Sequence, residues 1–231
     1  MSDIASSAED IPGIYNYCDN WCARCRFQSR CLVFKSIRAH ECGEPAPVAS
    51  AAKDGGRRDW HRELEQIPPL TDQESRELDA RFEEQRRRTT ADPLRSLAED
   101  YSKVAEPVLR ALDPLLRERE DAVAIAALDA LQHHALMIAA KIARAISGSF
   151  SEDFDRLEIQ SDAHGSAKVA HLAIQESRDA WAVLTEVGRA AADGVPRQLI
   201  DKLTALDTAL ARRFPLAMSF VREGFDTLPI E

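Results

Sequence analysis

The sequence predicts an all-α protein, a helical bundle of about four main helices with an N-terminal cysteine-rich segment. Only 9 of the 231 residues are glycine, whereas a β-sandwich or barrel needs a turn about every ten residues. Hydrophobic residues make up 45% of the chain and recur at helical spacing, and no segment alternates convincingly with the period of a strand. All 5 cysteines lie between Cys18 and Cys42, so the composition divides the chain into two unlike parts.

Three successive regions are predicted: a cysteine-rich metal- or cluster-binding segment over residues 1–43, a linker over residues 44–70, and the helical bundle over residues 71–231. The linker is rich in Pro, Ala and Gly and has no recurring apolar face. The N-terminus is acidic and lacks the basic and apolar regions of a signal peptide. We therefore expect a cytoplasmic protein, in which closely spaced cysteines bind metals more often than they form disulfides.

The overall charge and the apolar stretches argue against two classes of partner. The most apolar stretch, residues 122–146, is interrupted by polar and ionisable side chains at Asp129, His133, His134 and Lys141. A transmembrane helix needs about 20 predominantly apolar residues, so we expect no membrane association. The formal net charge of -9 argues against non-specific binding to nucleic acids, because their phosphates repel an acidic protein.

Local signals mark the first two helices of the bundle. Thr71 is the expected N-cap of the first, in a capping box that Glu74 completes, and the helix that follows is highly charged with a narrow apolar stripe. Asp92 caps the second helix and is followed by a proline, which suits the first helical turn. We expect Pro107 to kink this second helix, with a restart at the Asp-Pro pair of residues 113–114.

The remaining helices are bounded by glycine, proline and polar capping residues. A long apolar helix is expected to end at the Ser-Gly pair of residues 147–148, and a short helix is expected near Glu152 to Glu158. Another long helix begins near Ser161 or Asp162. The last opens at Pro196 and has leucines at three-to-four spacing, as is typical of a helix that packs one face against a core.

The cysteines Cys18, Cys22, Cys25 and Cys31 have the spacing C-x3-C-x2-C-x5-C. Thiolates bind soft metal centres, and four of them complete either a tetrahedral zinc site or an iron–sulfur cubane. Structural zinc usually takes two C-x-x-C pairs that lie about a dozen or more residues apart. One compact run is closer to ferredoxin-type motifs. We therefore expect a 4Fe–4S cluster, with zinc as the alternative and free or redox-active thiols as a weaker one.

The surroundings of these cysteines also fit a metal centre. Interleaved aromatic residues would shield a cluster from water, and a local excess of arginine and lysine would offset the negative charge of thiolate ligands. The same positive charge would suit an anionic partner, which is the weaker interpretation. Cys42, close after His40, is interpreted as a spare thiol, although it could replace Cys31 as a ligand.

Two strings of the sequence carry a resemblance to other proteins. They are YNYCDNWCARC, at residues 15–25, and DAHGSAKVAHLAIQESRDAW, at Asp162 to Trp181. Together they resemble an uncharacterised group of bacterial helical proteins that have an N-terminal YNYCDxWCxxC motif. The resemblance touches both parts of the chain and supports treating it as one unit. It implies no activity, cofactor or site residue.

A second candidate site consists of polar side chains on two helices of the bundle. Asp129 and His133 are spaced i,i+4 on one helix, and His164 and His171 belong to a polar stripe on another. If these faces met, the four side chains could line the polar pocket of an enzyme, although the Glu-x-x-His pairs of ferritin-like di-metal sites are absent from the sequence. We favour the interpretation that both stripes are solvated faces of amphipathic helices. His134 is expected to pack in the core.

The predicted function follows from the cysteine ligands. An iron–sulfur protein with a redox role is expected, in electron transfer, as a sensor or as an accessory factor, with a protein as its redox or interaction partner. A cluster held by four thiolates has no open coordination position, which favours electron transfer over substrate chemistry. The first alternative is a zinc-stabilised helical interaction or adaptor protein. The second is an enzyme that uses the Asp and His residues of the bundle.

Overall fold

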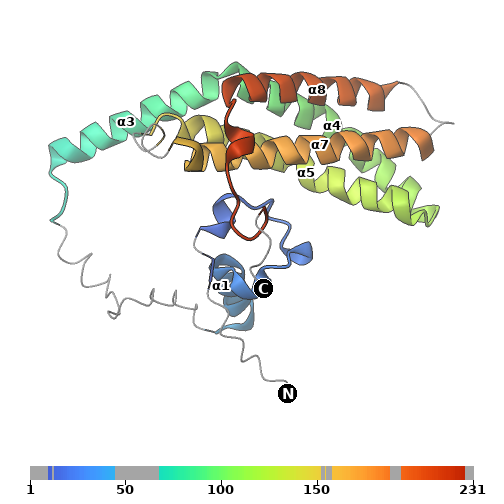
Figure 1. Ribbon diagram of the computed structural model, residues 1–231, viewed down its shortest axis with the longest axis horizontal. Coiled ribbons are helices and arrows are strands. Elements are labelled where there is room, and N and C mark those ends of the chain that lie inside the picture. The colour runs from blue at the N-terminus through green and yellow to red at the C-terminus, as the bar shows by residue number, and fades with distance from the viewer. Residues whose placement is uncertain are drawn as a thin grey trace. The chain divides into compact units, whose positions relative to one another are not determined.

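The computed structural model describes residues 10–11, 13–44, 68–151, 154, 158–187 and 194–226. Every regular element within them is a helix, which confirms the all-α prediction (Figure 1). The α-helices are α1 (Leu32–Cys42), α3 (Asp72–Ala91), α4 (Pro93–Glu118), α5 (Ala122–Gly148), α7 (Asp162–Val187) and α8 (Val195–Arg213). Short 3-10 helices are η1 (Ile14–Asn16), η2 (Cys22–Arg24), η3 (Gln28–Arg30), η4 (Glu158–Gln160) and η5 (Ala217–Ser219).

The contacts between residues divide the chain into two compact units. The first comprises Met1–Tyr15, Asn20–Glu83 and Glu223–Glu231, and the second comprises Asn16–Asp19 and Glu84–Arg222. Most of the predicted linker and most of the short helix predicted near Glu152 lie outside the described residues. Helix α3 belongs to the first unit as far as Glu83 and to the second unit from Glu84.

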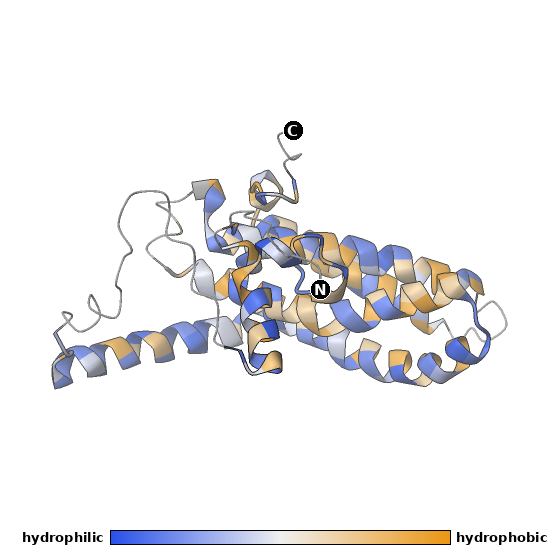
Figure 2. Ribbon diagram, turned by 90° about the horizontal axis from the view of Figure 1, so that it is seen from below, coloured by the Kyte–Doolittle hydropathy of each residue, from blue (hydrophilic) through white to orange (hydrophobic). Residues whose placement is uncertain are grey.

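Helix α3 begins with the predicted capping box. The Glu74 N–H donates to Thr71 Oγ1 at 3.2 Å, and the Thr71 N–H donates to Glu74 Oε2 at 2.8 Å. The Glu74 carboxylate accepts from both the N–H and the hydroxyl of Thr71, and these two hydrogen bonds lower the pKa of Glu74. The helix is hydrophilic over most of its length, as Figure 2 shows, and its few apolar side chains, Leu78 and Phe82, are exposed. The start of the helix agrees with the sequence-based expectation, whereas the apolar stripe, whose pattern predicted a packed face, is exposed.

Helix α4 differs from the sequence-based expectation at Pro114, where the helix does not restart. Its N-cap is the predicted Asp92, which accepts from the Leu94 N–H at 2.9 Å. The restart expected at residues 113–114 is wrong, because α4 continues through Pro107 and Pro114 to its end. Both prolines lie on the exposed face of the helix, where water can bond the carbonyls that a proline leaves unpaired. The opposite face is packed in the core, and this packing holds the helix together.

The second unit is a helical bundle with one hydrophobic core. Helix α5 packs against both α4 and α7, and α8 packs against both α7 and α4. Small side chains let the backbones of α5 and α7 approach closely: a Cβ on Gly148 would lie 3.3 Å from the Cβ of Ala163. The largest fully buried residues of the core include Tyr101, Leu128, Ile138, Ile142, Ile174, Trp181, Leu199 and Phe214. Area burial of this kind is the main stabilising contribution to the bundle.

Helix α5 also meets the length and composition criteria of a membrane span, so the apolar stretch is less interrupted than the sequence-based expectation assumed. In its most apolar 18-residue window, 44% of the residues are buried inside the protein. The core helix of a bundle satisfies the same criteria, because a helix covered on several sides is apolar on several sides.

A buried polar pair links α4 and α7 inside the core. The Trp181 indole N–H donates to the Tyr101 hydroxyl at 3.1 Å, and both side chains are 0% exposed. Burial raises the pKa of Tyr101 to about 12, and the hydrogen bonds to Trp181 and Ser177 oppose part of this shift. A buried phenolate has no compensating cation among these partners, so ionisation of Tyr101 and the folded core are incompatible.

We therefore expect alkaline destabilisation of the bundle that depends on Tyr101. Because the pKa of this phenol is raised on folding, its contribution to stability is complete below the unfolded-state pKa of about 10 and is lost as the pH rises towards 12. Circular dichroism during an alkaline titration measures the unfolding midpoint. Tyr101→Phe should move that midpoint upward, and Tyr15→Phe, at an exposed position of the first unit, should not. Equal midpoints for wild type and Tyr101→Phe would contradict the expectation.

After α8, residues 214–222 form a C-terminal strap that crosses α7. The Phe220 ring lies over Gly165, where a Cβ would come within 2.8 Å of Phe220 Cζ. Lys168 Nζ donates to the Phe220 carbonyl at 2.6 Å, and the Val221 N–H donates to Gln160 Oε1 at 2.9 Å. Helix α7 is unbroken at Gly165, and the absence of a side chain at this position makes room for the aromatic ring.

The first unit packs around Phe27. Its ring meets Phe225 edge to face with centroids 4.8 Å apart, and a Cβ on Gly224 would lie 3.1 Å from Phe27 Cζ. The φ of Gly224 is 79°, a left-handed conformation that suits glycine. Arg26 Nη2 donates to the Gly224 carbonyl at 2.6 Å. Residues near the C-terminus of the chain therefore belong to the same unit as the cysteine-rich segment.

Candidate metal centre

Three of the four candidate ligands lie in the first unit, at the ends of short helices. Cys22 opens η2, Cys25 follows it, and Cys31 lies between η3 and α1. The Phe27 N–H donates to Cys25 Sγ at 3.4 Å, and Gln28 Nε2 donates to the Cys22 carbonyl at 2.6 Å. Backbone N–H groups that point at a thiolate sulfur are a common second layer of bonds around metal-bound cysteines.

The fourth candidate ligand, Cys18, lies in the second unit, within the segment Asn16–Asp19. Three side chains of α5 hold this segment. Lys141 Nζ donates to the Asn16 carbonyl at 3.1 Å, and Arg144 Nη2 donates to Asn16 Oδ1 at 2.8 Å. His133 Nε2 lies 2.8 Å from the Asp19 carbonyl, which makes this nitrogen the protonated donor.

These contacts fix the direction of the Cys18 segment. Lys141 and His133 are eight residues apart, which is about 12 Å along a helix; Lys141 holds the first residue of the segment, Asn16, and His133 holds its last, Asp19. The segment therefore runs antiparallel to α5, with Cys18 between its two anchored ends. The Tyr17 ring, in the same segment, contacts the strap: its centroid lies 5.6 Å from the centroid of the Phe220 ring.

A positive charge lies next to Cys18. Lys141 is only 5% exposed, although it carries an ammonium group. Burial is the largest effect on Lys141 and lowers its pKa. Negative charge at Cys18 opposes this shift, as do the smaller effects of Asp162 and Asp19, whereas the nearby Arg144 lowers the pKa further. Lys141 is therefore a buried cation held by the Asn16 carbonyl, and negative charges around it oppose part of the effect of burial.

The donor chemistry fits a thiolate-bound centre, but the ligands are not gathered in this structure. None of the cysteines forms a disulfide, and Cys18, Cys22, Cys25 and Cys31 are partly exposed. Over the described part of the chain, no three His, Cys, Asp or Glu side chains form a group that could hold a metal ion. Cys42 is exposed at the far end of α1 from Cys31, about 15 Å along the helix axis. The two therefore cannot bind one ion together while α1 is intact.

The second candidate site is not assembled, because each of its four side chains has a partner of its own. Asp129 pairs with Arg117 at 2.8 Å, and His171 Nδ1 lies 2.6 Å from Asp207 Oδ1. His164 Nδ1 lies 2.8 Å from Ser161 Oγ, and its ring stacks on Phe154. The fourth side chain, His133, holds the Asp19 carbonyl as described above.

The interpretation of the polar stripe on α7 as a solvated face is wrong. His164 and His171 are each 5% exposed and Lys168 is 9% exposed. The reason is that α8 and the C-terminal strap cover this face, which a helical-wheel analysis of α7 alone cannot show. His134, expected in the core, is 1% exposed, with its Nε2 3.3 Å from Glu176 Oε2.

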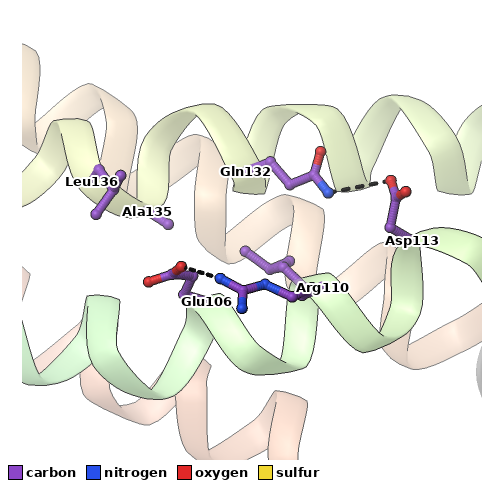
Figure 3. A pocket seen from close by; sticks show the side chains of 7 residues that line it. Glu106, Arg110, Asp113, Gln132, Ala135 and Leu136 are labelled. Atoms are coloured by element: carbon purple, nitrogen blue, oxygen red, sulfur yellow. Dashed lines mark hydrogen bonds and ion pairs between the residues drawn. The ribbon is translucent and has the colours of Figure 1, made fainter.

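A surface pocket of about 280 Å³ lies between α4 and α5. No sequence pattern predicted this pocket. Figure 3 shows Glu106 and Arg110, one turn apart on α4, paired with each other at 2.5 Å, and Gln132 Nε2 of α5 donating to Asp113 Oδ1 of α4 at 3.2 Å. Its other lining residues are Leu109, Ala135 and Leu136. The charged groups satisfy one another, and the lining contains no cysteine, histidine or serine that could act as a nucleophile or base.

Known proteins offer no guide to this chain. No protein-family model matches it, and neither the curated proteins nor the solved structures include one with significant similarity.

Proposed function

We propose that the protein is a cytoplasmic iron–sulfur protein. A four-helix bundle would present a 4Fe–4S cluster bound by Cys18, Cys22, Cys25 and Cys31. The observation that carries the proposal is the run of four cysteines over residues 18–31, in one compact C-x3-C-x2-C-x5-C spacing. Four thiolates leave no open iron, so the cluster would exchange electrons with a protein partner rather than bind a substrate.

Two further features support a thiolate-bound centre. The Cys18 segment is anchored to α5, so this ligand has a fixed place on the bundle, and the buried Lys141 supplies a positive charge beside it. The Cys25 sulfur accepts a backbone N–H, as thiolate ligands do.

Zinc is the second candidate, because the same four thiolates suit a tetrahedral ion. The protein would then be an interaction or adaptor module whose N-terminal segment folds on metal binding. This alternative predicts no colour, no sulfide and no redox chemistry.

Metal and sulfide analysis of the full-length protein, purified without oxygen, tests the proposal. We expect a brown protein that contains iron and sulfide in equal amounts. Serine substitution of any one of Cys18, Cys22, Cys25 and Cys31 should remove most of the bound iron, because a hydroxyl is a poor ligand for this soft centre. Cys42→Ser is the matched control and should retain it. A colourless protein with one zinc ion per chain would overturn the cluster in favour of the zinc alternative.

A further inference from the structure

The pocket between α4 and α5 is bordered on two sides by hydrogen bonds that join these helices. On one side the Ser102 hydroxyl donates to the Ala135 carbonyl, and on the other Gln132 Nε2 donates to Asp113 Oδ1 at 3.2 Å. These bonds set the separation of the two walls, so the cavity of about 280 Å³ exists before any ligand binds. The pocket is therefore a further candidate binding site, and it uses none of the cysteines.

Part of the pocket surface is apolar. Leu109, which is buried, and Leu136, which is 65% exposed, both line it. An apolar group placed against them would remove the Leu136 side chain from water, which lowers the free energy of the bound state. A cavity of about 150 Å³ in another protein holds benzene, so this larger cavity has room for one ring with a short chain. It is too small to enclose a nucleotide or a similarly large cofactor.

Open hydrogen-bond acceptors lie beside this apolar surface. The Glu106 carboxylate accepts from Arg110 through Oε1 at 2.5 Å, and Asp113 accepts from Gln132 through Oδ1. Over the described part of the chain, Glu106 Oε2, Asp113 Oδ2 and Gln132 Oε1 have no protein donor. Pro114 lacks an N–H, so the carbonyl of Arg110 also has no α-helical partner. A ligand that donates several hydrogen bonds is therefore matched to this pocket.

The charges around the pocket favour a cation. Two sets of ion pairs lie here, Glu106 with Arg110, and Asp113 and Asp129 with Arg117. Three carboxylates thus face two guanidinium groups, and one negative charge is left uncompensated among them. These side chains are between 34% and 78% exposed, so each pair is weak and can adjust to a ligand. An anion would add to the excess of negative charge, whereas a cation reduces it.

We propose that this pocket binds a small organic amine with an apolar body, such as an arylalkylamine. The body packs against Leu109 and Leu136, and the ammonium group donates to the open oxygen of Glu106. Figure 3 shows Glu106 and Leu136 at the same end of the pocket, so one ligand can contact both. A primary ammonium has three donors and no acceptor, which suits a site whose open carboxylate and amide oxygens are acceptors. The proposal is independent of the metal centre.

Titration of the full-length protein with phenethylamine at neutral pH, followed by NMR, tests the proposal. The backbone amides of the lining residues and the side-chain amide of Gln132 report on the pocket itself. We expect saturable shifts with a dissociation constant on the order of 1 mM, as is usual for a ligand of this size. Phenethyl alcohol has the same body without the charge and should bind about threefold more weakly. Hydrocinnamate, an anion, should bind about tenfold more weakly.

Two variants separate the contributions of charge and apolar surface. Glu106→Gln removes the charge and keeps the shape, so it should weaken phenethylamine binding about threefold and leave phenethyl alcohol unchanged. Its matched control is Glu99→Gln, because Glu99 forms the same kind of pair on α4, with Arg95 at 2.7 Å, and does not line the pocket. Leu136→Ala should weaken both ligands about threefold. Leu97→Ala, at an exposed position of α4, should weaken neither.

Several results would overturn the proposal. If the lining residues show no shifts up to about 10 mM phenethylamine, the pocket binds no such ligand. Equal affinities for phenethylamine and hydrocinnamate would mean that the ligand class is wrong. An equal loss in Glu106→Gln and Glu99→Gln would mean that general attraction of amines to an acidic protein accounts for the binding. Unchanged binding in Leu136→Ala, with circular dichroism showing that the variant is folded, would place the ligand elsewhere.

Discussion

Replacing Trp181 with alanine should lower the free energy of unfolding of the bundle by about 3–5 kcal/mol. Trp181 is 0% exposed and lies in the core formed by α4, α5, α7 and α8, so its loss leaves a large cavity that the surrounding helices cannot fill without moving. The change also removes the indole N–H that donates to Tyr101 at 3.1 Å. Urea unfolding followed by circular dichroism measures the effect, because this signal does not depend on tryptophan.

Two variants show how the effect of Trp181 divides. Trp181→Phe keeps most of the ring volume and loses the hydrogen bond, so we expect a loss of about 1–2 kcal/mol. Leu136→Ala is the control, since Leu136 is 65% exposed on α5, and it should change stability by less than about 0.5 kcal/mol. A loss below about 1 kcal/mol for Trp181→Ala would mean that this side chain is not enclosed in the core.

Gly165→Val should destabilise the bundle by about 1–3 kcal/mol, as overpacking does. The first atom of any side chain at this position would lie 2.8 Å from Phe220 Cζ, and further contacts of 3.1 Å with the same ring leave it little room to move aside. Ala182→Val is the matched control on the same helix, because Ala182 is exposed. It should change stability by less than about 0.5 kcal/mol.

A double-mutant cycle identifies the cause of the Gly165 effect. Phe220→Ala alone should be destabilising by about 3 kcal/mol, because the ring is 6% exposed. In the double variant, the valine side chain at position 165 occupies the space that the ring has left. We therefore expect the loss of stability in the double variant to be about 1–3 kcal/mol smaller than the sum of the losses in the two single variants. Additivity within about 0.5 kcal/mol would show that the strap does not press on α7 at this point.

The sequence predicted the features of the fold that depend on neighbouring residues. Helix caps are such features, because each capping side chain lies within a few residues of the group that it bonds. Short-range rules therefore located the capping box of Thr71 and Glu74 and the N-cap Asp92. The prediction of a helix restart at Pro114 is wrong because the effect of a proline depends on residues that are distant in the sequence. Its cost depends on whether the freed carbonyl faces water, and this is known only once the buried face of α4 is known.

Features that depend on distant residues were beyond sequence reasoning. The burial of His171 requires the approach of α8, and the anchoring of Cys18 requires Lys141, more than a hundred residues further along the chain. One signal did exist, since Lys141 interrupted an apolar helix and an ionisable residue in such a place needs a reason. The spacing of Cys18, Cys22, Cys25 and Cys31 named a class of ligand, but spacing alone carries no information on how these thiols approach one another.

The position of Gly224 and Phe225 in the first unit has a consequence for the order of folding. The hydrogen bond from Arg26 to Gly224 joins residues 198 positions apart, so the ribosome makes the N-terminal member of this contact long before its partner. Contacts between such distant residues form late, because closure of a long loop must precede them. The bundle can therefore fold before these contacts form, and the packing around Phe27 is a late step that waits for Gly224 and Phe225.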